Sequence, residues 1–137
     1  MAFLDPVTLS GSGVTLEPLH EDHHDGLVAA ASDGELWNLW YTAIPRPEGM
    51  RAEIARRLQL QTAQNMLPFT TRRVDTGTII GMTTFMNPDH VNTRVEIGHT
   101  WNAASAQRSG TNAESKLLML THAFEVWGCI AVEFRTA

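Results

Sequence analysis

Eight residues in the last third of the chain have the types and spacing of a loop that could bind an anion. Gln107–Glu114 reads QRSGTNAE and lies between an expected strand and an expected helix. The first turn of a helix leaves backbone N–H groups without an intrahelical partner, and the helix dipole adds about half a positive charge there. Such a helix start favours a phosphate or pyrophosphate, which Gly110 lets approach closely and to which Arg108 adds charge. The alternative is an ordinary capped helix after a polar loop, since the segment has neither a Walker motif nor a G-x-G-x-x-G fingerprint.

Glu96 is the candidate general base, because a carboxylate on a strand can accept a proton from a reacting group. Strand alternation over 94–101 places Val95, Ile97, His99 and Trp101 on one face, and Arg94, Glu96, Gly98 and Thr100 on the other. Glu96 and His99 can share a site only if a bulge interrupts the strand, for which Gly98 is the candidate. Without the bulge, His99 packs with Val95 and Ile97. The alternative for Glu96 is an exposed side chain that pairs with Arg94 or another neighbour.

Three histidines near the N-terminus could in principle bind a metal. His20, His23 and His24 share a face if they lie on a helix, so a zinc site is geometrically possible. Exposed helices commonly begin with polar residues of this kind, however. We therefore predict no metal site.

The aromatic residues and the single cysteine also leave alternatives. Trp37, Trp40 and Tyr41 could line an acceptor pocket or belong to the hydrophobic core. Cys129 cannot form an intramolecular disulfide, and its apolar neighbours predict a buried, unreactive thiol.

The elements that position these residues are expected to form a mixed α/β domain. Strands are expected at 14–16, 69–74, 78–86, 94–101 and 130–135, and helices at 20–32, 50–65 and 112–127. The last strand and the strand at 94–101 flank a helix, so they should be parallel and joined by a right-handed crossover. An antiparallel meander followed by a βαβ unit is the expected topology.

Two of the helices have patterns that predict their buried faces. In the helix at 50–65, Ile54 and Leu58 lie at helical spacing, and the arginines are expected on the opposite, solvent side: Arg51, Arg56 and Arg57. In the last helix the apolar face is expected to be Leu117, Leu120, Phe124 and Trp127. Thr111 and Glu114 match a capping box, and Gly128 lies where a helix ends.

Composition bounds the class of protein. The chain has 137 residues, of which 43% are hydrophobic, and a net charge of −5. These values predict one folded domain, and the acidic balance argues against nucleic acid or an anionic membrane as partner. The longest apolar run, Leu27–Ala31, is too short to cross a bilayer, and no signal peptide is recognised. We therefore expect a cytoplasmic protein.

The chain resembles the GNAT superfamily of N-acetyltransferases, in the branch that includes ribosomal-protein N-terminal acetyltransferases. Val95-Glu96-Ile97-Gly98-His99-Thr100-Trp101, followed by Gln107-x-x-Gly110-x-Asn112-x-Glu114, carries the resemblance. Upstream, the same branch is matched by Leu39-Trp40-Tyr41-Thr42, by Leu67-Pro68-Phe69 and by Gly77-Thr78-Ile79-Ile80-Gly81. In this superfamily the Q/R-x-x-G-x-G/A loop binds the pyrophosphate of acetyl-CoA.

The resemblance implies a GNAT-like domain over 1–137, with helices on both faces of a mixed sheet. It implies an acetyl-CoA-dependent N-acetyltransferase that lets a primary amine, on a protein N-terminus or a small molecule, attack the thioester directly. Glu96 would be the general base. The cofactor-binding residues would be Trp101, Asn102, Gln107, Arg108, Ser109, Gly110, Thr111 and Asn112. The alternative is a non-catalytic CoA-binding or interaction module derived from the same fold.

Two departures from the family pattern affect these expectations. Asn112 stands where glycine or alanine is commonest, although a small polar residue there should still let the ligand approach. The helix and two strands that usually follow the last strand are absent, so the strand with Ile130, Val132 and Phe134 is expected to have an open edge. This favours either a homodimer that fills the edge or a chain shorter than its fold, with weak activity.

Overall fold

The computed structural model describes residues 4–38, 44–107 and 109–134. Within these ranges the strands are β1 (Leu9–Ser10), β2 (Val14–Pro18), β3 (Met66–Arg73), β4 (Ile79–Asp89), β5 (Arg94–Asn102) and β6 (Ala131–Phe134). The helices are α1 (His24–Ser32), α2 (Met50–Thr62) and α3 (Thr111–Thr121), and α3 continues into a π-helical turn at His122–Val126. Short 3₁₀ turns lie at Glu21–His23, Leu36–Asn38, Pro47–Gly49 and Ala104–Ala106.

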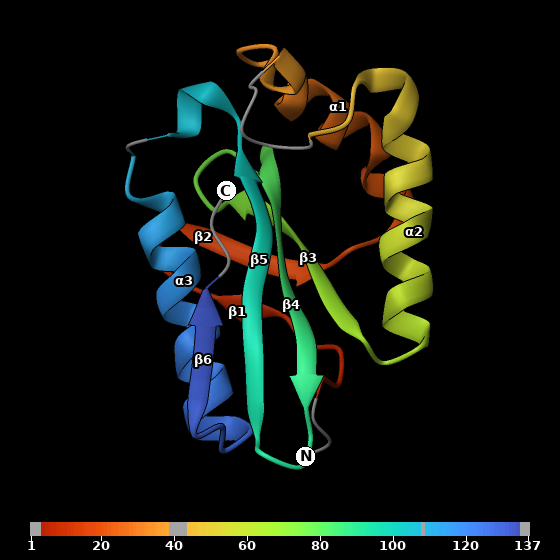
Figure 1. Cartoon of the computed structure of the whole chain (residues 1–137). Helices are drawn as coiled ribbons and strands as arrows, with labels where there is room; N and C mark the ends of the chain where they lie inside the picture. The colour runs from red at the N-terminus through yellow and green to blue at the C-terminus, as the bar shows by residue number, and fades with distance from the viewer. Residues whose placement is uncertain (1–3, 39–43, 108, 135–137) are drawn as a thin grey trace.

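The strands form one mixed sheet in the order β1-β2-β3-β4-β5-β6. Neighbours from β1 to β5 are antiparallel, whereas β6 runs parallel to β5 after the chain has passed through α3 (Figure 1). The expected fold, an antiparallel meander followed by a βαβ unit, is confirmed. The short strand β1, which pairs with β2 across the turn at 11–13, was not expected from the sequence.

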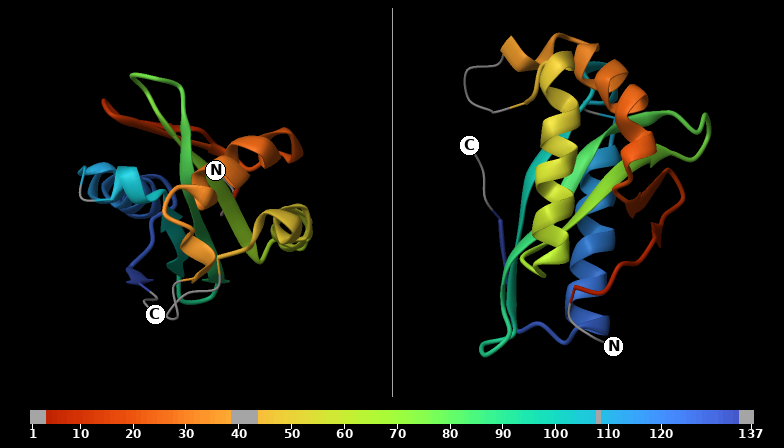
Figure 2. Two further views of the ribbon diagram at one scale, coloured as in Figure 1. Left: turned by 90° about the horizontal axis from the view of Figure 1, so that it is seen from above. Right: turned by 90° about the vertical axis from the view of Figure 1, so that its right-hand side faces the viewer.

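Helices cover both faces of the sheet, with α1 and α2 on one side and α3 on the other (Figure 2). Each side has its own core. The core under α1 and α2 includes Leu27, Met50, Ile54, Met82 and Trp101. The core under α3 includes Leu16, Phe69, Phe85, Ile97 and Met119. Burial of each such side chain stabilises the fold by roughly 1.5–3 kcal/mol. Among the described residues, every helix is too short or too polar to span a lipid bilayer.

A β-bulge interrupts β5 and changes which face its side chains occupy. Thr84 pairs with Gly98 and Met82 pairs with Trp101, so the single residue between them on β4 opposes two residues, His99 and Thr100. His99 takes a left-handed conformation with φ of 48°. The bulge therefore lies just after Gly98, the residue at which the sequence suggested one.

The bulge overturns the expected alternation beyond Ile97. Val95 and Ile97 belong to the core under α3, but Trp101 belongs to the core under α1 and α2. The extra residue reverses the parity of the strand, so Trp101 points to the face opposite to the expected one. The expectation that His99 packs with Val95 and Ile97 is also wrong, because His99 is exposed.

Helix α3 begins and packs differently from the sequence prediction. Its N-cap is Gly110, with φ of 87° and no side-chain cap, so the expected Thr111–Glu114 capping box does not form. Thr111 is the first helical residue, and its Oγ1 donates to the carbonyl of Ala106 at 3.2 Å. Gly128 follows the π-helical turn with φ of 70°, which agrees with its expected role at the end of the helix.

The buried face of α3 agrees only in part with the one expected, because Leu120 packs against the core under α3 but Leu117 and Phe124 do not. Ser115, Met119 and Ala123 face the sheet, whereas Leu117 is 64% exposed and Phe124 is exposed. The hydroxyl of the buried Ser115 donates to the carbonyl of Thr111 at 2.9 Å, within the helix. Trp127 is buried as expected.

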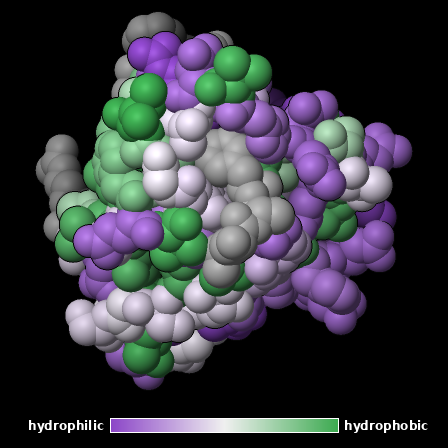
Figure 3. All heavy atoms as spheres, turned by 90° about the horizontal axis from the view of Figure 1, so that it is seen from below, coloured by the Kyte–Doolittle hydropathy of each residue, from purple (hydrophilic) through white to green (hydrophobic). Residues whose placement is uncertain are grey.

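Exposed apolar side chains gather around α3 and β6. Besides Leu117 and Phe124 they include Ile130, which is 74% exposed, and Phe134. Two of the three apolar residues named for the last strand, Ile130 and Phe134, are therefore exposed. Seen from below, the side of the molecule with α3 and β6 is more hydrophobic than the side with α2 (Figure 3).

Candidate functional site

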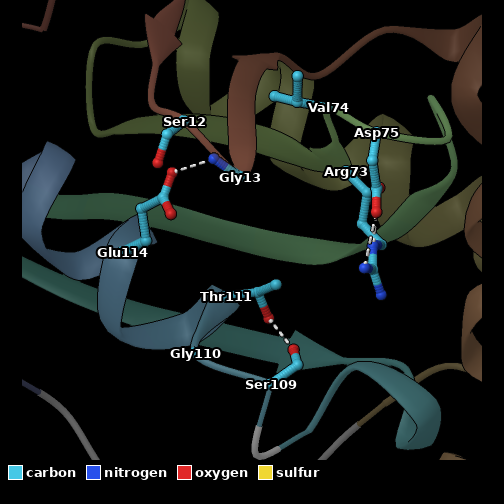
Figure 4. Close-up of a pocket in the computed structure, with 9 residues that line it drawn as sticks. All are labelled: Ser12, Gly13, Arg73, Val74, Asp75, Ser109, Gly110, Thr111 and Glu114. Carbon is cyan, nitrogen blue, oxygen red and sulfur yellow. Dashed lines mark hydrogen bonds and ion pairs between the residues drawn. The ribbon is translucent and has the colours of Figure 1, made fainter.

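A pocket of about 380 Å³ lies beside the start of α3 (Figure 4). The loop before α3 forms one wall with Ser109, Gly110 and Thr111, and the opposite wall comes from the β1–β2 and β3–β4 turns. The remaining lining residues are Ser12, Gly13, Arg73, Val74, Asp75 and Glu114. Four of the eight residues that the sequence assigned to an anion-binding loop, Ser109, Gly110, Thr111 and Glu114, therefore line one pocket.

Side-chain bonds hold this loop in place. The hydroxyl of Ser109 donates to the carbonyl of Ala106, and Thr111 Oγ1 lies 3.2 Å from Ser109 Oγ. A Cβ built on Gly110 would have no atom of the described residues within 4 Å, so among these residues nothing covers the backbone at the first turn of α3. The left-handed conformation of Gly110 turns the chain into the helix here, and glycine adopts it without steric cost. The open backbone leaves room for a ligand at the helix start.

Glu114 joins the start of α3 to the N-terminal hairpin. Its Oε1 accepts hydrogen bonds from the backbone N–H of Gly13 at 2.8 Å and of Val14 at 3.0 Å. These bonds use one carboxylate oxygen of Glu114. A second acidic lining residue, Asp75, is paired with Arg73 at 3.0 Å, and this hydrogen bond lowers the pKa of Asp75. Both acidic groups on the pocket wall thus have donors of their own.

The other residues of the predicted cofactor site occupy different environments. Gln107 Nε2 donates to the carbonyl of Asn102 at 3.1 Å, which ties the loop to the end of β5. Asn112 is exposed on the first turn of α3, and Arg108 lies outside the described residues. Trp101 is 6% exposed, and its Nε1 has no hydrogen-bond partner among the described residues. Its side chain lies in the core under α1 and α2, so its backbone, not its ring, is available to a ligand.

Glu96, the predicted base, lies on β5 outside this pocket. Its side chain is half-buried, and Oε2 accepts a hydrogen bond from Asn87 Nδ2 at 3.1 Å. Arg94, the partner suggested by the sequence, has an ion pair with Glu133 at 3.9 Å. Glu96 and Asn102 are six positions apart on β5, a span of roughly 20 Å. Only an extended ligand can reach both the loop and Glu96.

Arg57 is the residue that sequence reasoning missed. The sequence placed it on the solvent side of α2, but it is only 2% exposed. Its Nε donates to Glu53 Oε2 at 2.8 Å, and its Nη1 donates to Thr84 Oγ1 at 3.0 Å and to the carbonyl of His99 at 3.2 Å. The guanidinium thus bonds the bulge itself. The available signal in the sequence was Glu53, four residues before Arg57, which can pair with it on one helix face.

Electrostatics favour the ion pair at this position. Burial would raise the pKa of Glu53, but hydrogen bonds and charge from Arg56 and Arg57 outweigh burial and lower it to about 2. Burial lowers the pKa of Arg57, and Glu53 opposes that effect. An arginine guanidinium stays protonated in proteins. The pair is therefore ionised at neutral pH.

The remaining sequence candidates have structural roles or lie outside the described residues. His23 contacts Glu17 Oε1 at 3.1 Å and Thr70 Oγ1 at 2.7 Å. Within the residues that the structure describes, no group of three or more His, Cys, Asp or Glu side chains could hold a metal ion.

Of the aromatic candidates, Trp37 packs in part against the core under α1 and α2, whereas Trp40 and Tyr41 lie outside the described residues. Cys129 is buried, as predicted, and burial raises the pKa of its thiol.

Comparison with known proteins gives a family match over most of the chain. The model of the Acetyltransferase (GNAT) domain matches residues 14–137. No curated protein matches the chain. Among solved structures, a T. thermophilus protein assigned as an acetyltransferase is 26% identical with a TM-score of 0.79, over 99% of this chain and 69% of that one. A GCN5-related N-acetyltransferase from Brucella melitensis is 27% identical with a TM-score of 0.74, over 91% of this chain and 57% of that one.

A further similar structure contains a cofactor. It is the RimL ribosomal-protein acetyltransferase in complex with coenzyme A, 16% identical with a TM-score of 0.71. The match covers 85% of this chain and 67% of that chain. At this identity the likeness concerns the fold.

Proposed function

We propose a function from one premise: the chain belongs to the GNAT acetyltransferase family. The proposed function is transfer of an acetyl group from acetyl-CoA to a primary amine. The observation that carries it is the start of α3, where Gly110 opens the backbone toward a pocket at the family's cofactor-binding loop. A catalytically silent CoA-binding module is the competing function, and the experiment below distinguishes the two.

The loop residues would hold the pyrophosphate of the cofactor. Backbone N–H groups of the first turn of α3 are the donors, and Gly110 leaves the space above them open. Gln107 fixes the loop to β5 through the carbonyl of Asn102. Because Glu114 and Asp75 already accept hydrogen bonds from donors of the protein, their charges oppose an anion less than free carboxylates would. Two structures with the same fold, of RimL and of the microcin C7 self-immunity acetyltransferase, hold coenzyme A or acetyl-CoA.

The distance between the loop and Glu96 suits an extended ligand. A cofactor anchored at the start of α3 must run along β5 for its acyl end to approach Glu96, roughly 20 Å away along the strand. Acetyl-CoA, when bound, supplies the acetyl group as an activated thioester. Glu96, directly or through a water, would take the proton that an ammonium must lose before its nitrogen can attack. The protein would otherwise contribute orientation and backbone hydrogen bonds.

The acceptor is proposed as an amine, on a protein N-terminus or on a small molecule. One similar structure is described as a ribosomal-protein alpha-N-acetyltransferase, and the microcin C7 enzyme was solved with AMP beside acetyl-CoA. Both kinds of acceptor therefore belong in the assay. A homodimer remains a proposal, with light scattering as its measurement.

The test compares two substitutions at Gly110. Asp and Asn have nearly the same shape and meet the same left-handed backbone, so Gly110→Asp and Gly110→Asn differ mainly by one negative charge. At a separation of 4 Å and an effective dielectric constant near 20, like unit charges repel by about 4 kcal/mol. We expect calorimetry to show that Gly110→Asp weakens CoA binding by about 100-fold or more relative to Gly110→Asn.

Two outcomes would contradict the proposal. Equal CoA affinities of Gly110→Asp and Gly110→Asn would remove the loop from the binding site. Wild-type protein that binds CoA but releases no thiol with any amine of a panel of N-terminal peptides and small amines would favour the non-catalytic module.

A further inference from the structure

The bulge in β5 directly follows the stretch whose pairing with β6 the structure describes. The described register between the two strands runs from Arg94 to Ile97 on β5, opposite Ala131–Phe134, where the described residues end. His99 and Thr100 form the bulge immediately afterwards. Beyond the bulge the strand continues to Asn102, which bonds the loop before α3. The bulge thus lies between Glu96 and the loop, on the path that the proposed function assigns to the cofactor.

The conformation of this bulge is unfavourable without support. A non-glycine residue with φ of 48° carries a steric cost of roughly 1–2 kcal/mol. The bulge also leaves one residue of β5 without a regular partner on β4, so its polar groups need other contacts. The carbonyl of His99 has such a contact, because it accepts a hydrogen bond from Arg57 at 3.2 Å.

Arg57 makes this contact as a buried and oriented group. The same nitrogen, Nη1, donates to Thr84 on β4, so it links the two strands at the point where their register changes. The other end of the guanidinium is held by Glu53 at 2.8 Å. A planar guanidinium bonded at both ends has little rotational freedom, which a lysine could not reproduce.

The hydrogen bond from Arg57 also determines the orientation of a backbone donor in the bulge. His99 O and Thr100 N–H belong to the same planar peptide unit, and in a trans peptide they point to opposite sides. When Arg57 fixes the carbonyl of His99, it also fixes the orientation of the Thr100 N–H, which points away from Arg57.

We propose that Arg57, held by Glu53, is a positioning residue that fixes the His99–Thr100 peptide of the bulge and thereby orients the acyl end of the bound cofactor. This inference rests on the proposed acetyl transfer. It assigns a role to a buried ion pair on α2, which lies across the sheet from α3 and its cofactor loop. The role concerns the rate of transfer and not the affinity for CoA, because the proposed phosphate-binding groups lie on the loop beyond Asn102 and not in the bulge.

The test compares Arg57→Met with Arg56→Met. Arg56 is the adjacent arginine, is half-exposed and bonds the same carboxylate at 2.8 Å, so its substitution removes the same charge without touching β5. Hydrogen exchange of the amides in 98–102 is measured by mass spectrometry and compared with that of β3, so that global destabilisation affects both segments equally. We expect Arg57→Met to speed exchange in 98–102 by about tenfold relative to β3, and Arg56→Met to leave that ratio unchanged.

Kinetics give the second readout. A misplacement of about 1 Å at reacting groups can cost on the order of 100-fold in rate. We therefore expect Arg57→Met to lower kcat by about 10- to 100-fold, with the KM for acetyl-CoA within about threefold of the wild type. Arg57→Lys keeps the charge and one of the bonds, so it should recover part of kcat. Wild-type kcat in folded Arg57→Met, or equal acceleration of exchange in 98–102 and in β3, would overturn the inference.

Failure of the proposed function gives a different result. If the wild-type chain transfers no acetyl group, the acetyl-transfer proposal fails, and hydrogen exchange still decides whether Arg57 holds the bulge. Faster exchange confined to 98–102 supports that hold, and unchanged exchange overturns it.

Discussion

Replacing Gly81 by alanine should separate the two strands at the end of the proposed cofactor path. Gly81 on β4 pairs with Asn102 on β5. A Cβ added at Gly81 would lie 2.0 Å from the carbonyl oxygen of Trp101 and 3.0 Å from the Cα of Asn102. Close carbon–oxygen contacts between strands are normally about 3.3–3.6 Å, so the two strands must move apart by about 1 Å or more. Both contacts are with backbone, which cannot move aside as a flexible side chain can.

The expected cost of this substitution is large for a small domain. Overpacking in a filled interior typically costs about 1–3 kcal/mol, and a backbone clash belongs at the upper end of that range, near 3 kcal/mol. Domains of this size have a free energy of unfolding of about 5–15 kcal/mol. With a urea m-value of about 1–3 kcal/mol/M, the midpoint of unfolding should fall by about 1–3 M.

The measurement is urea unfolding followed by tryptophan fluorescence and circular dichroism. Gly49→Ala is the matched control, because the nearest atom of the described residues to its added Cβ is 3.9 Å away and its φ of −97° suits any residue. We expect the control to stay within about 1 kcal/mol of the wild type. If Gly81→Ala unfolds at the wild-type midpoint, then β4 and β5 are not as close at Trp101 as the structure has them, and the reasoning fails.

Further expected outcomes concern catalysis, pH and thiol reactivity. Glu96→Gln should lower the rate of acetyl transfer by about 10²–10⁴-fold with little change in CoA affinity. If the variant is as fast as the wild type between pH 6 and 9, the base lies elsewhere. Glu53, whose folded pKa of about 2 is below its ordinary 4.5, should contribute about 2 kcal/mol of stability, discounted for solvent screening; this contribution is complete above pH 4.5 and lost as the pH falls toward 2. Acid unfolding of Glu53→Gln should lack that part of the pH dependence. Burial lowers the pKa of His23 and of His122, so the folded state favours their neutral form. Their contribution to the free energy of unfolding is therefore present above pH 6.5 and lost at lower pH. Unfolding curves between pH 7 and 5 would detect this loss. The Cys129 thiol should react with Ellman's reagent only when the protein unfolds, and rapid reaction of the folded protein would show that the site is open.

The sequence predicted the fold because its signals are local. Alternation identified the strands, and the order of strand, helix and strand predicted the parallel pairing of β5 with β6. Alternation also placed Val95 and Ile97 correctly on one face. It failed at Trp101 because a bulge changes the parity of every later residue, and no local pattern fixes the position of a bulge to one residue.

The candidate site was predictable in part for the same reason. Gly110 and the polar residues around it are a local signal for an anion-binding loop, and Ser109 to Thr111 do line a pocket. Arg57 was missed because amphipathic patterns place charged residues in solvent, and only a distant carbonyl explains its burial. Glu114 matched a local capping pattern, yet its carboxylate bonds Gly13, a residue 101 positions away.

This long-range bond has a consequence for the order in which the chain folds. Contacts between residues far apart in sequence form late, because closing a long loop costs entropy before the contact stabilises anything. The start of α3 and the N-terminal hairpin are therefore secured to each other only when nearly all of the chain has folded. A ligand that binds at this junction recognises the completed fold and not a partly folded intermediate. Such a ligand slows unfolding and leaves the rate-limiting step of folding unchanged.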